Sequence, residues 1–517
     1  MLSSYVRDTW QTPTDEGRPL VDAATGEEVA RWTSKPADPG ALEHARQVGG
    51  PGLRELTFHQ RAAILKSLAK YLNERTGEFY ERSLWTGATP RDSAVDIDGG
   101  IGVLFVYASK GTKELPDASH YVDGAQEQIG KEGTFVAQHI CTPLLGAAVQ
   151  INAFNFPVWG MLEKFAPAFL AGVPSVVKPA SQTAYLTELV FRRMVESGLL
   201  PEGSIQLLAA GVGDLLEHVT AQDAVAFTGS ATTAQQLRAH PTVVAQATRF
   251  NAEADSLNYA VLGPDVTPGT SEFDLFVKAV TTEMTVKAGQ KCTAIRRAFV
   301  PAAHLDNVQE AVRDRLAKVT VGHPGDESVR MGALASTGQR DEVRRAVKEL
   351  RTAGELVFGD PEHVEVVGAD AQRGAFVSPL LLRCDDPDRP EPHDVEAFGP
   401  VSTLMPYQST PQVIDYAARG SGSLVGSVVS HDDDFVRDVV LGTAPWHGRV
   451  HVLDRDDAQE STGHGSPLPH LVHGGPGRAG GGEELGGVRG MLHYMQRTAV
   501  QGSPAKVRLF TAEASDE

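Results

Sequence analysis

Three side chains, far apart in the chain, are of types that catalysis often uses. Cys292 stands in TVKAGQKCTAIRR among small and polar residues, and a thiolate is a strong nucleophile. Glu253 lies just before a predicted strand in RFNAEADSLNYAVLG, where a carboxylate can act as a general base. Asn155, in INAFNFPVWG, can aim an amide N–H at a developing oxyanion. The three types are those of a nucleophile, a base and an oxyanion donor.

Each of these residues also has an ordinary structural explanation. Cys292 can be a satisfied core thiol, Glu253 a solvated loop carboxylate, and Asn155 an Asx turn or helix cap. Taken one at a time, the residues leave both explanations open. The other two cysteines, Cys141 and Cys384, have no comparable context and are interpreted as structural.

A second group of residues is typical of a nucleotide site. Lys178 ends the predicted strand PSVVK and would face the ligand crevice of a parallel sheet. Gly229 and Ser230, in FTGSATTA, lie between a strand and a helix N-terminus, where backbone N–H groups and the helix dipole suit a pyrophosphate. The G-x-G-x-x-G fingerprint is absent from this region, and a plain capping turn remains the alternative.

Four strand–helix units must position these side chains. Strands alternating with helices predict a parallel, doubly wound sheet, which binds ligands beyond the carboxyl ends of its strands. The predicted strands are 146–151, 174–178, 204–208 and 224–227, and the predicted helices are 157–172, 184–198, 214–221 and 231–239.

The alternation begins again after residue 256, which predicts a second α/β domain. Residues 1 to about 126 are expected to be more helical, and the amphipathic stretch 56–85 is the clearest helix there. Residues 129–145 and 492–503 fit neither lobe and are predicted to be projecting strands that pair with another subunit.

The segment 463–487 contains an unusual cluster of glycines, in GHGSPLPHLVHGGPGRAGGGEELGG. A flexible linker is one interpretation. Its Pro, His, Arg and Glu residues favour a shaped loop instead.

Bulk composition limits the class of protein. A length of 517 residues suggests two to four packed units, and 41% hydrophobic and 22% charged residues are ordinary for a globular protein. A net charge of −19 disfavours nucleic acid or an anionic membrane as a partner. Three cysteines provide no disulfide framework and no metal-ligand spacing, so we expect no metal site and a reducing cytoplasm. The start of the chain shows no signal peptide, and no apolar run is long enough for a membrane span.

The order of these motifs carries more information than any one of them. The series Asn155, Lys178, FTGS, Glu253, GQKC and EAFGPV at 396–401 resembles the aldehyde dehydrogenase superfamily over nearly the whole chain. The resemblance implies an enzyme in which Cys292 attacks an aldehyde to give a thiohemiacetal. Asn155 and the backbone N–H of Cys292 would hold the oxyanion, hydride would pass to a nicotinamide cofactor, and Glu253 would activate water to hydrolyse the thioester.

The resemblance also implies an α/β fold with a Rossmann-like, doubly wound cofactor domain, a second α/β catalytic domain and a small bridging β element. The expected boundaries are 1–128 and 146–255 for the cofactor domain, 256–478 for the catalytic domain, and 129–145 with 492–503 for the bridging strands. We expect a homodimer or a higher homo-oligomer.

Cofactor preference can be argued from one position. Many members of the superfamily have a glutamate three residues after the lysine, which binds the adenosine ribose and would repel a 2′-phosphate. Here that position is Ser181, beside Ala180, so NADP is expected over NAD. By resemblance, Glu396 and Phe398 would hold the nicotinamide ribose and ring.

Several segments resemble one branch of the superfamily: the aldehyde dehydrogenase part of the bifunctional ring-opening protein of phenylacetate degradation. They are TGATPRDSAVDIDGGIG, INAFNFPVWGMLEKFAP, EMTVKAGQKCTAIRR and ESTGHGSPLPHLVHGGPGRAGGGEELGG. The branch is also similar to the semialdehyde dehydrogenase that acts on 3,4-dehydroadipyl-CoA semialdehyde in benzoate degradation. The bifunctional protein carries a C-terminal enoyl-CoA hydratase domain, whereas this sequence ends at Glu517, so a separate hydratase is expected as pathway partner.

The branch implies that the substrate is a CoA-linked semialdehyde, 3-oxo-5,6-dehydrosuberyl-CoA semialdehyde. The alternatives are the dehydroadipyl substrate, a general aldehyde and, outside enzymes, a catalytically inactive nucleotide-binding protein. His473 and Arg478 are expected to bind substrate, and His464 is a further candidate for the aldehyde tunnel. Arg296 and Arg297 are considered for CoA phosphates, although a structural role is favoured for each.

Overall fold

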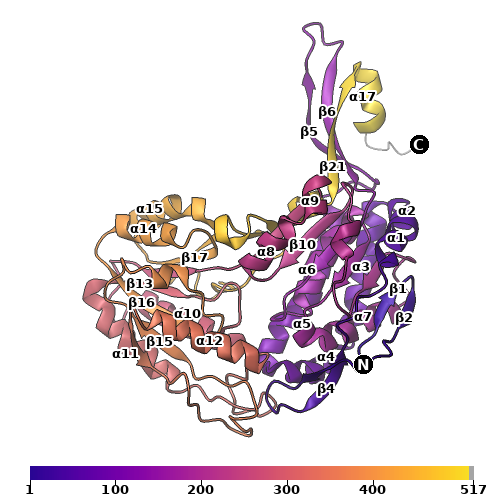
Figure 1. The fold of residues 1–517 in the computed structure, drawn as a ribbon. Helices are drawn as coiled ribbons and strands as arrows, with labels where there is room; N and C mark the ends of the chain where they lie inside the picture. Colours follow the sequence, from indigo (N-terminus) through magenta and orange to yellow (C-terminus); the bar gives the residue numbers. More distant parts are fainter. Residues whose placement is uncertain (512–517) are drawn as a thin grey trace.

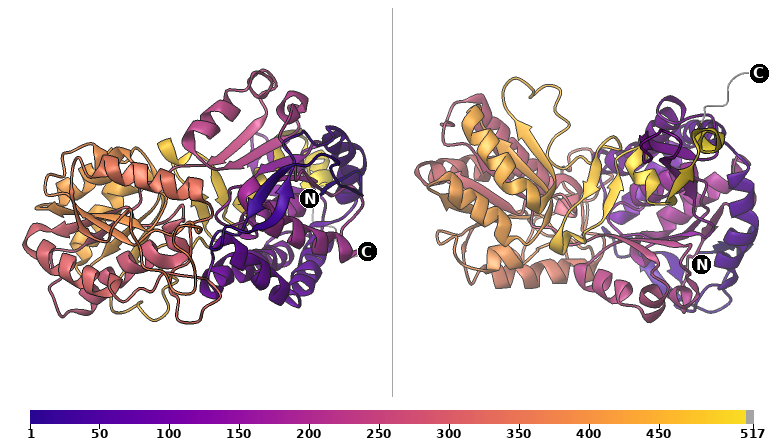
Figure 2. Two further views of the ribbon diagram at one scale, coloured as in Figure 1. Left: turned by 60° about the horizontal axis from the view of Figure 1, so that its bottom comes forward. Right: turned by 90° about the horizontal axis from the view of Figure 1, so that it is seen from above.

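The computed structural model describes residues 1–511. Two seven-stranded sheets, each packed between helices, form two lobes, and a three-stranded sheet projects from one of them (Figure 1). Views from two further directions show the same two lobes side by side (Figure 2). In the described part of the chain, no helix combines the length and apolar character needed to cross a membrane.

The first sheet is the predicted doubly wound sheet. Its order is β11-β10-β7-β8-β9-β1-β2, and its strands are β7 (Ala148–Ile151), β8 (Ser175–Lys178), β9 (Ile205–Leu207), β10 (Ala224–Thr228), β11 (Arg249–Glu253), β1 (Ser4–Val6) and β2 (Thr9–Gln11). The chain adds β8 and β9 on one side of β7, and then β10 and β11 on the other. The topological switch point therefore lies between β7 and β10, where such sheets bind ligands.

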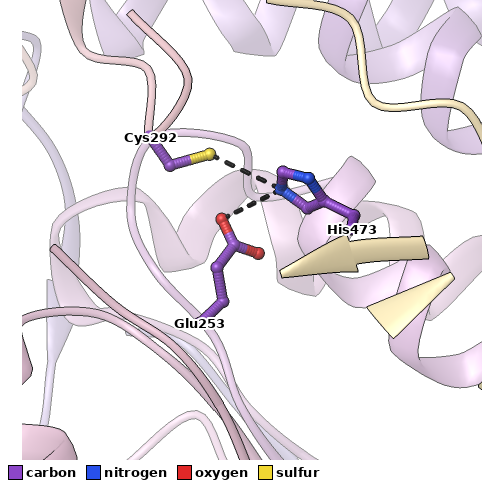
Figure 3. Close-up of side chains that lie close together, drawn as sticks. All are labelled: Glu253, Cys292 and His473. Atoms are coloured by element: carbon purple, nitrogen blue, oxygen red, sulfur yellow. Dashed lines mark hydrogen bonds and ion pairs between the residues drawn. The ribbon is translucent and has the colours of Figure 1, made fainter. Parts of the chain in front are cut away.

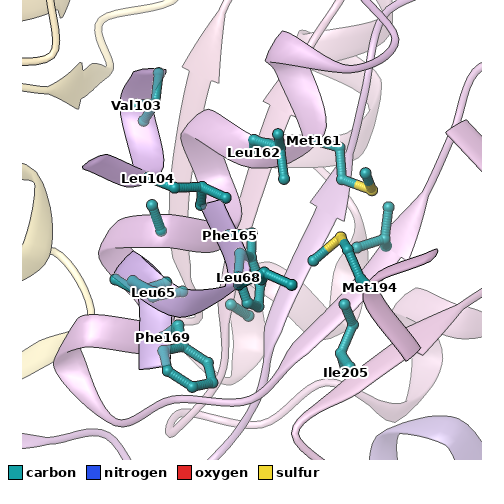
Figure 4. Close-up of a cluster of buried hydrophobic side chains, with 14 of the residues drawn as sticks. Leu65, Leu68, Val103, Leu104, Met161, Leu162, Phe165, Phe169, Met194 and Ile205 are labelled. Carbon is teal, nitrogen blue, oxygen red and sulfur yellow. The ribbon is translucent and has the colours of Figure 1, made fainter. Parts of the chain in front are cut away.

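Helices cover both faces of this sheet. They are α3 (Phe58–Asn73), α4 (Thr76–Ser83), α5 (Pro90–Lys113), α6 (Trp159–Ala171), α7 (Ala184–Glu196) and α8 (Ala231–Arg238). α6 is buried on nearly all sides, because α3 and α5 pack over it. Leu65 of α3, Phe165 of α6 and Met194 of α7 belong to one buried cluster (Figure 4). Burial of apolar surface in this cluster is the main stabilisation of the lobe.

One predicted helix of the alternation is wrong. The segment 214–221 forms only a 3-10 turn, Leu215–His218. Gly213 enters it with a positive φ of 56°, and Val219 is already extended, so the chain has room for a single turn. Leu215 and Leu216 nevertheless reach the core.

The second lobe is the predicted second α/β unit. Its sheet has the order β14-β15-β16-β13-β12-β17-β18. The strands are β12 (Tyr259–Leu262), β13 (Arg297–Pro301), β14 (Glu355–Phe358), β15 (Leu380–Arg383), β16 (Val401–Tyr407), β17 (Ser423–Val429) and β18 (His447–Leu453), and the main helices are α10 (Ser271–Thr285), α11 (Leu305–Leu316), α12 (Thr337–Leu350), α14 (Thr410–Arg419) and α15 (Asp433–Thr443). The strands are parallel except for β14, which runs antiparallel to β15.

The N-terminal region is less helical than expected. The first 32 residues form four strands, β1, β2, β3 (Arg18–Val21) and β4 (Glu28–Trp32), before the helices begin. The predicted long helix 56–85 is divided into α3 and α4 at Arg75. A capping box between Thr57 and Gln60 fixes the start of α3.

The projecting sheet consists of β5 (Tyr121–Gln128), β6 (Val136–Pro143) and β21 (Met495–Gly502), in the order β21-β6-β5 (Figure 1). The segments 129–145 and 492–503 contribute two of its strands. At its base, the Arg249 guanidinium of β11 donates hydrogen bonds to the main-chain oxygens of His493 and Met495, at 2.9 and 2.6 Å. The projecting sheet is thus attached directly to one strand of the first lobe.

Candidate active site

Two hollows meet at Cys292, between the lobes. A cleft of about 590 Å³ lies on one side, and a small cavity of about 50 Å³ lies on the other. Asn155, Glu253 and Cys292 line both of them. The structure therefore brings together the three residues that the sequence singled out for chemistry.

Asn155 follows β7 at the switch point and is 6% exposed. Its Nδ2 donates a hydrogen bond to the main-chain oxygen of Gln290 at 3.1 Å, which ties the amide to the loop that carries Cys292. An amide nitrogen carries two N–H groups, so this bond leaves one of them for another acceptor. The arrangement suits an oxyanion donor.

Glu253 is the last residue of β11, a strand that the sequence did not reveal. β11 runs parallel to β10, with Thr228 opposite Glu253 in the register. We expected this carboxylate in a loop before a strand, but the polar residues Arg249 and Asn251 hid an edge strand. The carboxylate thus stands at the carboxyl end of a strand and is 3% exposed, so a solvated loop position is wrong.

A strained turn presents Cys292. Lys287, Ala288 and Gly289 all have positive φ values, of 56°, 50° and 67°. At Gly289 an added Cβ would stand 2.1 Å from the Gly399 oxygen, so only glycine fits this close approach. The main-chain oxygen of Cys292 accepts a hydrogen bond from Asn258 Nδ2 at 2.8 Å. Strain of this kind is typical of functional sites.

His473 stands beside both reacting side chains (Figure 3). It belongs to β19 (Val472–Gly474), which pairs with β20 (Glu483–Leu485) inside the glycine-rich segment. Its Nε2 lies 3.2 Å from Glu253 Oε1 and 3.9 Å from Cys292 Sγ. His473 lines the small cavity, so the expected substrate contact stays a prediction, and its side chain also touches the candidate base and nucleophile. The segment 463–487 contains the paired strands β19 and β20, so the sequence-based interpretation as a shaped loop, and not a flexible linker, is confirmed.

Burial and charge control protonation at this site. Burial raises the pKa of the Cys292 thiol, and the Glu253 carboxylate raises it further. Burial would also raise the pKa of Glu253, but His473 and Lys164 outweigh that effect and lower it. The resting thiol is therefore protonated, and Glu253 is ionised.

Behind Glu253 lies a buried charged cluster that sequence reasoning missed. Lys164 Nζ donates to Glu163 Oε1 at 3.2 Å, to Glu484 Oε2 at 3.0 Å and to Thr228 Oγ1 at 2.7 Å. Burial raises the pKa of Glu484 to about 8. One signal was available: Glu163 and Lys164 are adjacent charges in an otherwise apolar helix, and buried charges need a partner.

The larger cleft is lined by five of the seven residues predicted to bind the nucleotide, and Lys178 and Ser181 are not among its lining residues. Ala180, Gly229, Ser230, Glu396 and Phe398 line it. In the turn after β10, polar groups that were expected to face a pyrophosphate already have hydrogen-bond partners within the protein. The Gly229 N–H donates to the Glu253 oxygen at 3.2 Å, and the Ser230 hydroxyl caps α8 by accepting from the Thr233 N–H.

Two polar side chains in this cleft have atoms without a hydrogen-bond partner in the described part of the chain. Glu396 accepts a hydrogen bond at Oε2 from the Ser256 N–H, and its Oε1, 3.9 Å from Arg296 Nε, has no hydrogen-bond partner among the residues that the structure describes. Burial raises the pKa of Glu396 to about 7. Neither polar atom of the Asn152 side chain, which also lines the cleft, has a partner within residues 1–511. Unsatisfied buried polar atoms fit a ligand that carries hydroxyl groups, as a ribose does.

Two cations, Arg18 and Lys178, lie near Ser181, where the adenosine end of the nucleotide is expected. Arg18 of β3 donates from Nη2 to the hydroxyl of Ser181. Lys178 lies with its Nζ 4.7 Å from the centre of the Trp32 ring. Burial, with the Arg18 charge, lowers the pKa of Lys178 to about 8. Arg18 was not singled out from the sequence.

Three arginines and one histidine lie away from the small cavity. Arg478, expected at the substrate, lines the larger cleft and donates to the main-chain oxygens of His393 and Asp394. Arg296 and Arg297 are 5% and 0% exposed and bind main-chain oxygens, so they are structural and unsuited to CoA phosphates. His464 is buried and contacts the Ser427 hydroxyl at 2.6 Å.

Comparison with known proteins gives a family match over most of the chain. Residues 10–500 match the model described as "Aldehyde dehydrogenase family". The chain is 47% identical over 478 residues to the 3,4-dehydroadipyl-CoA semialdehyde dehydrogenase of Aromatoleum evansii, covering 92% of this chain and 93% of that protein. It is 51% identical over 176 residues to Protein MaoC of Klebsiella aerogenes, which is 34% of this chain and 51% of that protein.

Solved structures have the same fold. Betaine aldehyde dehydrogenase of Staphylococcus aureus, in a complex with NAD+, superposes with a TM-score of 0.84 at 22% identity, covering 97% of this chain and 98% of that one. PnpE of Pseudomonas sp. WBC-3 superposes with a TM-score of 0.83 at 20% identity, covering 97% of each chain.

Proposed function

The chain belongs to the aldehyde dehydrogenase family, and we propose that it oxidises the aldehyde of a ring-opened, CoA-linked semialdehyde to the acid with NADP. As a member of that family it is an oxidoreductase acting on the aldehyde group. The observation that carries the proposal is the convergence of Asn155, Glu253 and Cys292 where the cleft meets the small cavity.

The chemistry of these residues supports covalent oxidation. The Cys292 sulfur attacks the aldehyde carbon and forms a thiohemiacetal, while the Asn155 amide and the Cys292 backbone N–H hold the oxyanion. When bound, the nicotinamide cofactor supplies the acceptor for hydride. Glu253 then takes a proton from water, which hydrolyses the thioester on Cys292 and frees the acid. Behind Glu253, Lys164 donates hydrogen bonds to both Glu163 and Glu484.

The cleft residues fit a dinucleotide. Glu396 and Asn152 offer the unpaired polar atoms described above to sugar hydroxyls, and Phe398 offers an aromatic wall. Glu396 and Phe398 would hold the nicotinamide ribose and ring, whereas Ala180, Gly229 and Ser230 would hold the rest of the dinucleotide.

The residue at position 181 supports NADP over NAD. A hydroxyl stands where a carboxylate would repel a 2′-phosphate, and repulsion between two such charges in a partly desolvated site costs on the order of 1 kcal/mol or more. Arg18 contacts that hydroxyl, and Lys178 lies close by. A phosphate at this place would meet two cations and a hydroxyl donor.

There are two candidate substrates, and a different observation supports each of them. The branch motifs favour 3-oxo-5,6-dehydrosuberyl-CoA semialdehyde of phenylacetate catabolism. The Aromatoleum relative, with its 47% identity over 478 residues, supports 3,4-dehydroadipyl-CoA semialdehyde. Phe156 and Trp159 give the small cavity two aromatic walls.

Partners follow from the same proposal. The semialdehyde would come from a separate enoyl-CoA hydratase that opens the ring. Within residues 1–511, the outer edges of β5 and β21 in the projecting sheet are unpaired, which favours strand pairing in a homodimer or higher homo-oligomer.

A panel of aldehydes tests the function. The purified protein is mixed with NADP+ and an aldehyde. The aldehyde is either one of the two CoA semialdehydes, generated in place by an added hydratase, or a simple aldehyde. Reduced nicotinamide is followed by its near-ultraviolet absorbance. We expect turnover with a CoA semialdehyde, none in Cys292→Ala and unchanged turnover in the matched control Cys384→Ala. Absence of turnover with every aldehyde would favour an inactive nucleotide-binding protein.

A further inference from the structure

A single ring nitrogen of His473 faces both reacting side chains. Its Nε2 lies 3.9 Å from Cys292 Sγ and 3.2 Å from Glu253 Oε1, as Figure 3 shows. His473 is 2% exposed, and its backbone pairs with Glu484 in the β19–β20 ladder, so the ring is held in place. Its Nδ1 has no hydrogen-bond partner in the described part of the chain.

This geometry makes the two contacts alternatives. In a neutral imidazole, one nitrogen carries the proton and the other carries the lone pair. Nε2 therefore either donates to the Glu253 carboxylate or accepts from the Cys292 thiol. A carboxylate such as Glu253 can take a proton from water without a histidine beside it. The contact between His473 Nε2 and the Cys292 sulfur therefore needs a separate explanation.

We propose that His473 is a catalytic residue that accepts the thiol proton of Cys292, with Glu253 holding the imidazolium that results. The S–H bond breaks, its electron pair stays on sulfur, and an N–H bond forms at Nε2. The thiolate then attacks the aldehyde carbon. The inference rests on the proposed aldehyde oxidation and adds the group that activates its nucleophile.

The groups around His473 favour this transfer. Burial lowers the pKa of His473 and Arg449 lowers it further, but Glu253 and Glu163 outweigh both and raise it. Two carboxylates on separate elements, β11 and α6, therefore stabilise the imidazolium.

The groups around the thiol explain why an acceptor is needed. Burial raises the pKa of Cys292, Glu253 and Glu163 raise it further, and Lys291 opposes them. A thiol in this setting does not ionise alone near neutral pH. A positive charge on His473 at 3.9 Å offsets the repulsion from Glu253 and stabilises the thiolate.

The transfer also puts the two base steps in order. While Nε2 carries the thiol proton, Glu253 is paired with an imidazolium and is a weak base for water. The proton must pass from His473 to solvent water, as the net proton released by the oxidation, before Glu253 can promote hydrolysis. Nucleophile activation and water activation are therefore separated in time, although the groups are adjacent.

Alkylation of the resting chain tests the proposal without aldehyde or cofactor. Iodoacetamide reacts with the thiolate, and intact mass reports its rate across a range of pH; Cys292→Ala identifies the site. In His473→Asn, we expect alkylation at neutral pH to slow by about tenfold or more and the pH at which the rate rises to move upward. The matched control is His470→Asn, which changes an exposed histidine of the same segment and should leave the profile unchanged.

Comparison with Glu253→Gln decides between the two acceptors. An unchanged alkylation profile in His473→Asn, together with a slowed one in Glu253→Gln, would overturn the proposal and reduce His473 to a positioning residue. NADPH binding, followed by fluorescence, checks that each variant is folded, and His473→Gln replaces the asparagine variant if that one is not. Because no aldehyde is present, the result is independent of whether the proposed substrate is correct.

Discussion

Arg18 donates a hydrogen bond to the hydroxyl of Ser181, although the two residues are 163 positions apart in the chain. The contact joins the N-terminal hairpin of β3 and β4 to the turn that follows β8. It places a guanidinium at the position from which the superfamily's usual glutamate is missing. Selection for a 2′-phosphate would then depend on a residue outside the recognised motif.

Replacing Arg18 with alanine should weaken binding of 2′,5′-ADP by about tenfold or more, because a charge-assisted phosphate contact is lost. Binding of 5′-ADP, which lacks the 2′-phosphate, should change little. Titration calorimetry measures both affinities. Arg31→Ala is the control, since Arg31 lies on the paired strand and contacts Glu28 instead. Equal losses for both nucleotides would contradict the role of Arg18.

Replacing Ser181 with glutamate should shift preference from NADP towards NAD. The new carboxylate would pair with Arg18 and repel a 2′-phosphate. The ratio of kcat/KM for the two cofactors, measured with one aldehyde, should fall by about tenfold. Ser181→Ala is the control, because it removes the hydroxyl without adding charge. An unchanged ratio in the glutamate variant would refute this account.

Replacing Glu253 with glutamine should allow one turnover and then stop. Hydride transfer does not need the carboxylate, whereas hydrolysis of the thioester does. Rapid mixing should show a burst of NADPH close to one equivalent per site, followed by a slow steady rate. If burst and steady rate disappear together, Glu253 is not the deacylation base.

Replacing Asn155 with alanine should lower kcat by about 10²–10³-fold, the loss seen when one oxyanion donor is removed. Cofactor affinity should be retained, because the amide donates to the main-chain oxygen of Gln290 and would hold the oxyanion. Steady-state kinetics and NADPH titration measure the two effects. Asn155→Asp is a second test, since it keeps the shape but replaces the donor with an anion, and it should be at least as defective.

Cofactor affinity should depend on the ionisation of Glu396. Burial raises the pKa of this carboxyl from 4.5 to about 7, so it is largely protonated below neutral pH and ionised above it. Only the ionised form accepts from both ribose hydroxyls, so binding should tighten several-fold between about pH 6 and about pH 8. Fluorescence titration of NADPH measures this change.

Glu396→Gln should bind with a weak and nearly pH-independent affinity. Because folding raises the pKa of Glu396, its ionisation also costs stability as pH rises from 4.5 through about 7. The glutamine variant should therefore lose less stability than the wild type over that range. A pH dependence of NADPH binding that survives the substitution would assign it to another group.

The sequence predicted the parallel sheets well, because their signal is local. Five of these strands are buried, mainly apolar runs, and each is followed by a helix along the chain: β7, β8, β10, β12 and β13. β11 escaped detection because an edge strand with Arg249 and Asn251 lacks an apolar run. The first four strands escaped because each is five residues long or shorter, with many polar positions.

The order of the motifs correctly predicted that Cys292, Glu253 and Asn155 lie at one site. The individual contacts within that site could not be predicted from the sequence. His473 reaches Glu253 only after the glycine-rich segment folds back as β19 and β20. Arg18 reaches Ser181 through the N-terminal hairpin. Both contacts depend on long-range packing, to which no spacing rule applies. Glu163 and Lys164 differ, because two charges in an apolar helix were visible in the sequence.

Through Arg249, strand β11 connects the projecting sheet to the candidate active site. At one end of this five-residue strand, Arg249 binds the base of the projecting sheet, and at the other end stands Glu253, the proposed base. A strand rises only about 3.3 Å per residue, so the two ends are separated by little more than a dozen ångströms. A neighbouring subunit that paired with the projecting sheet would therefore contact an element fastened to the strand that ends at Glu253.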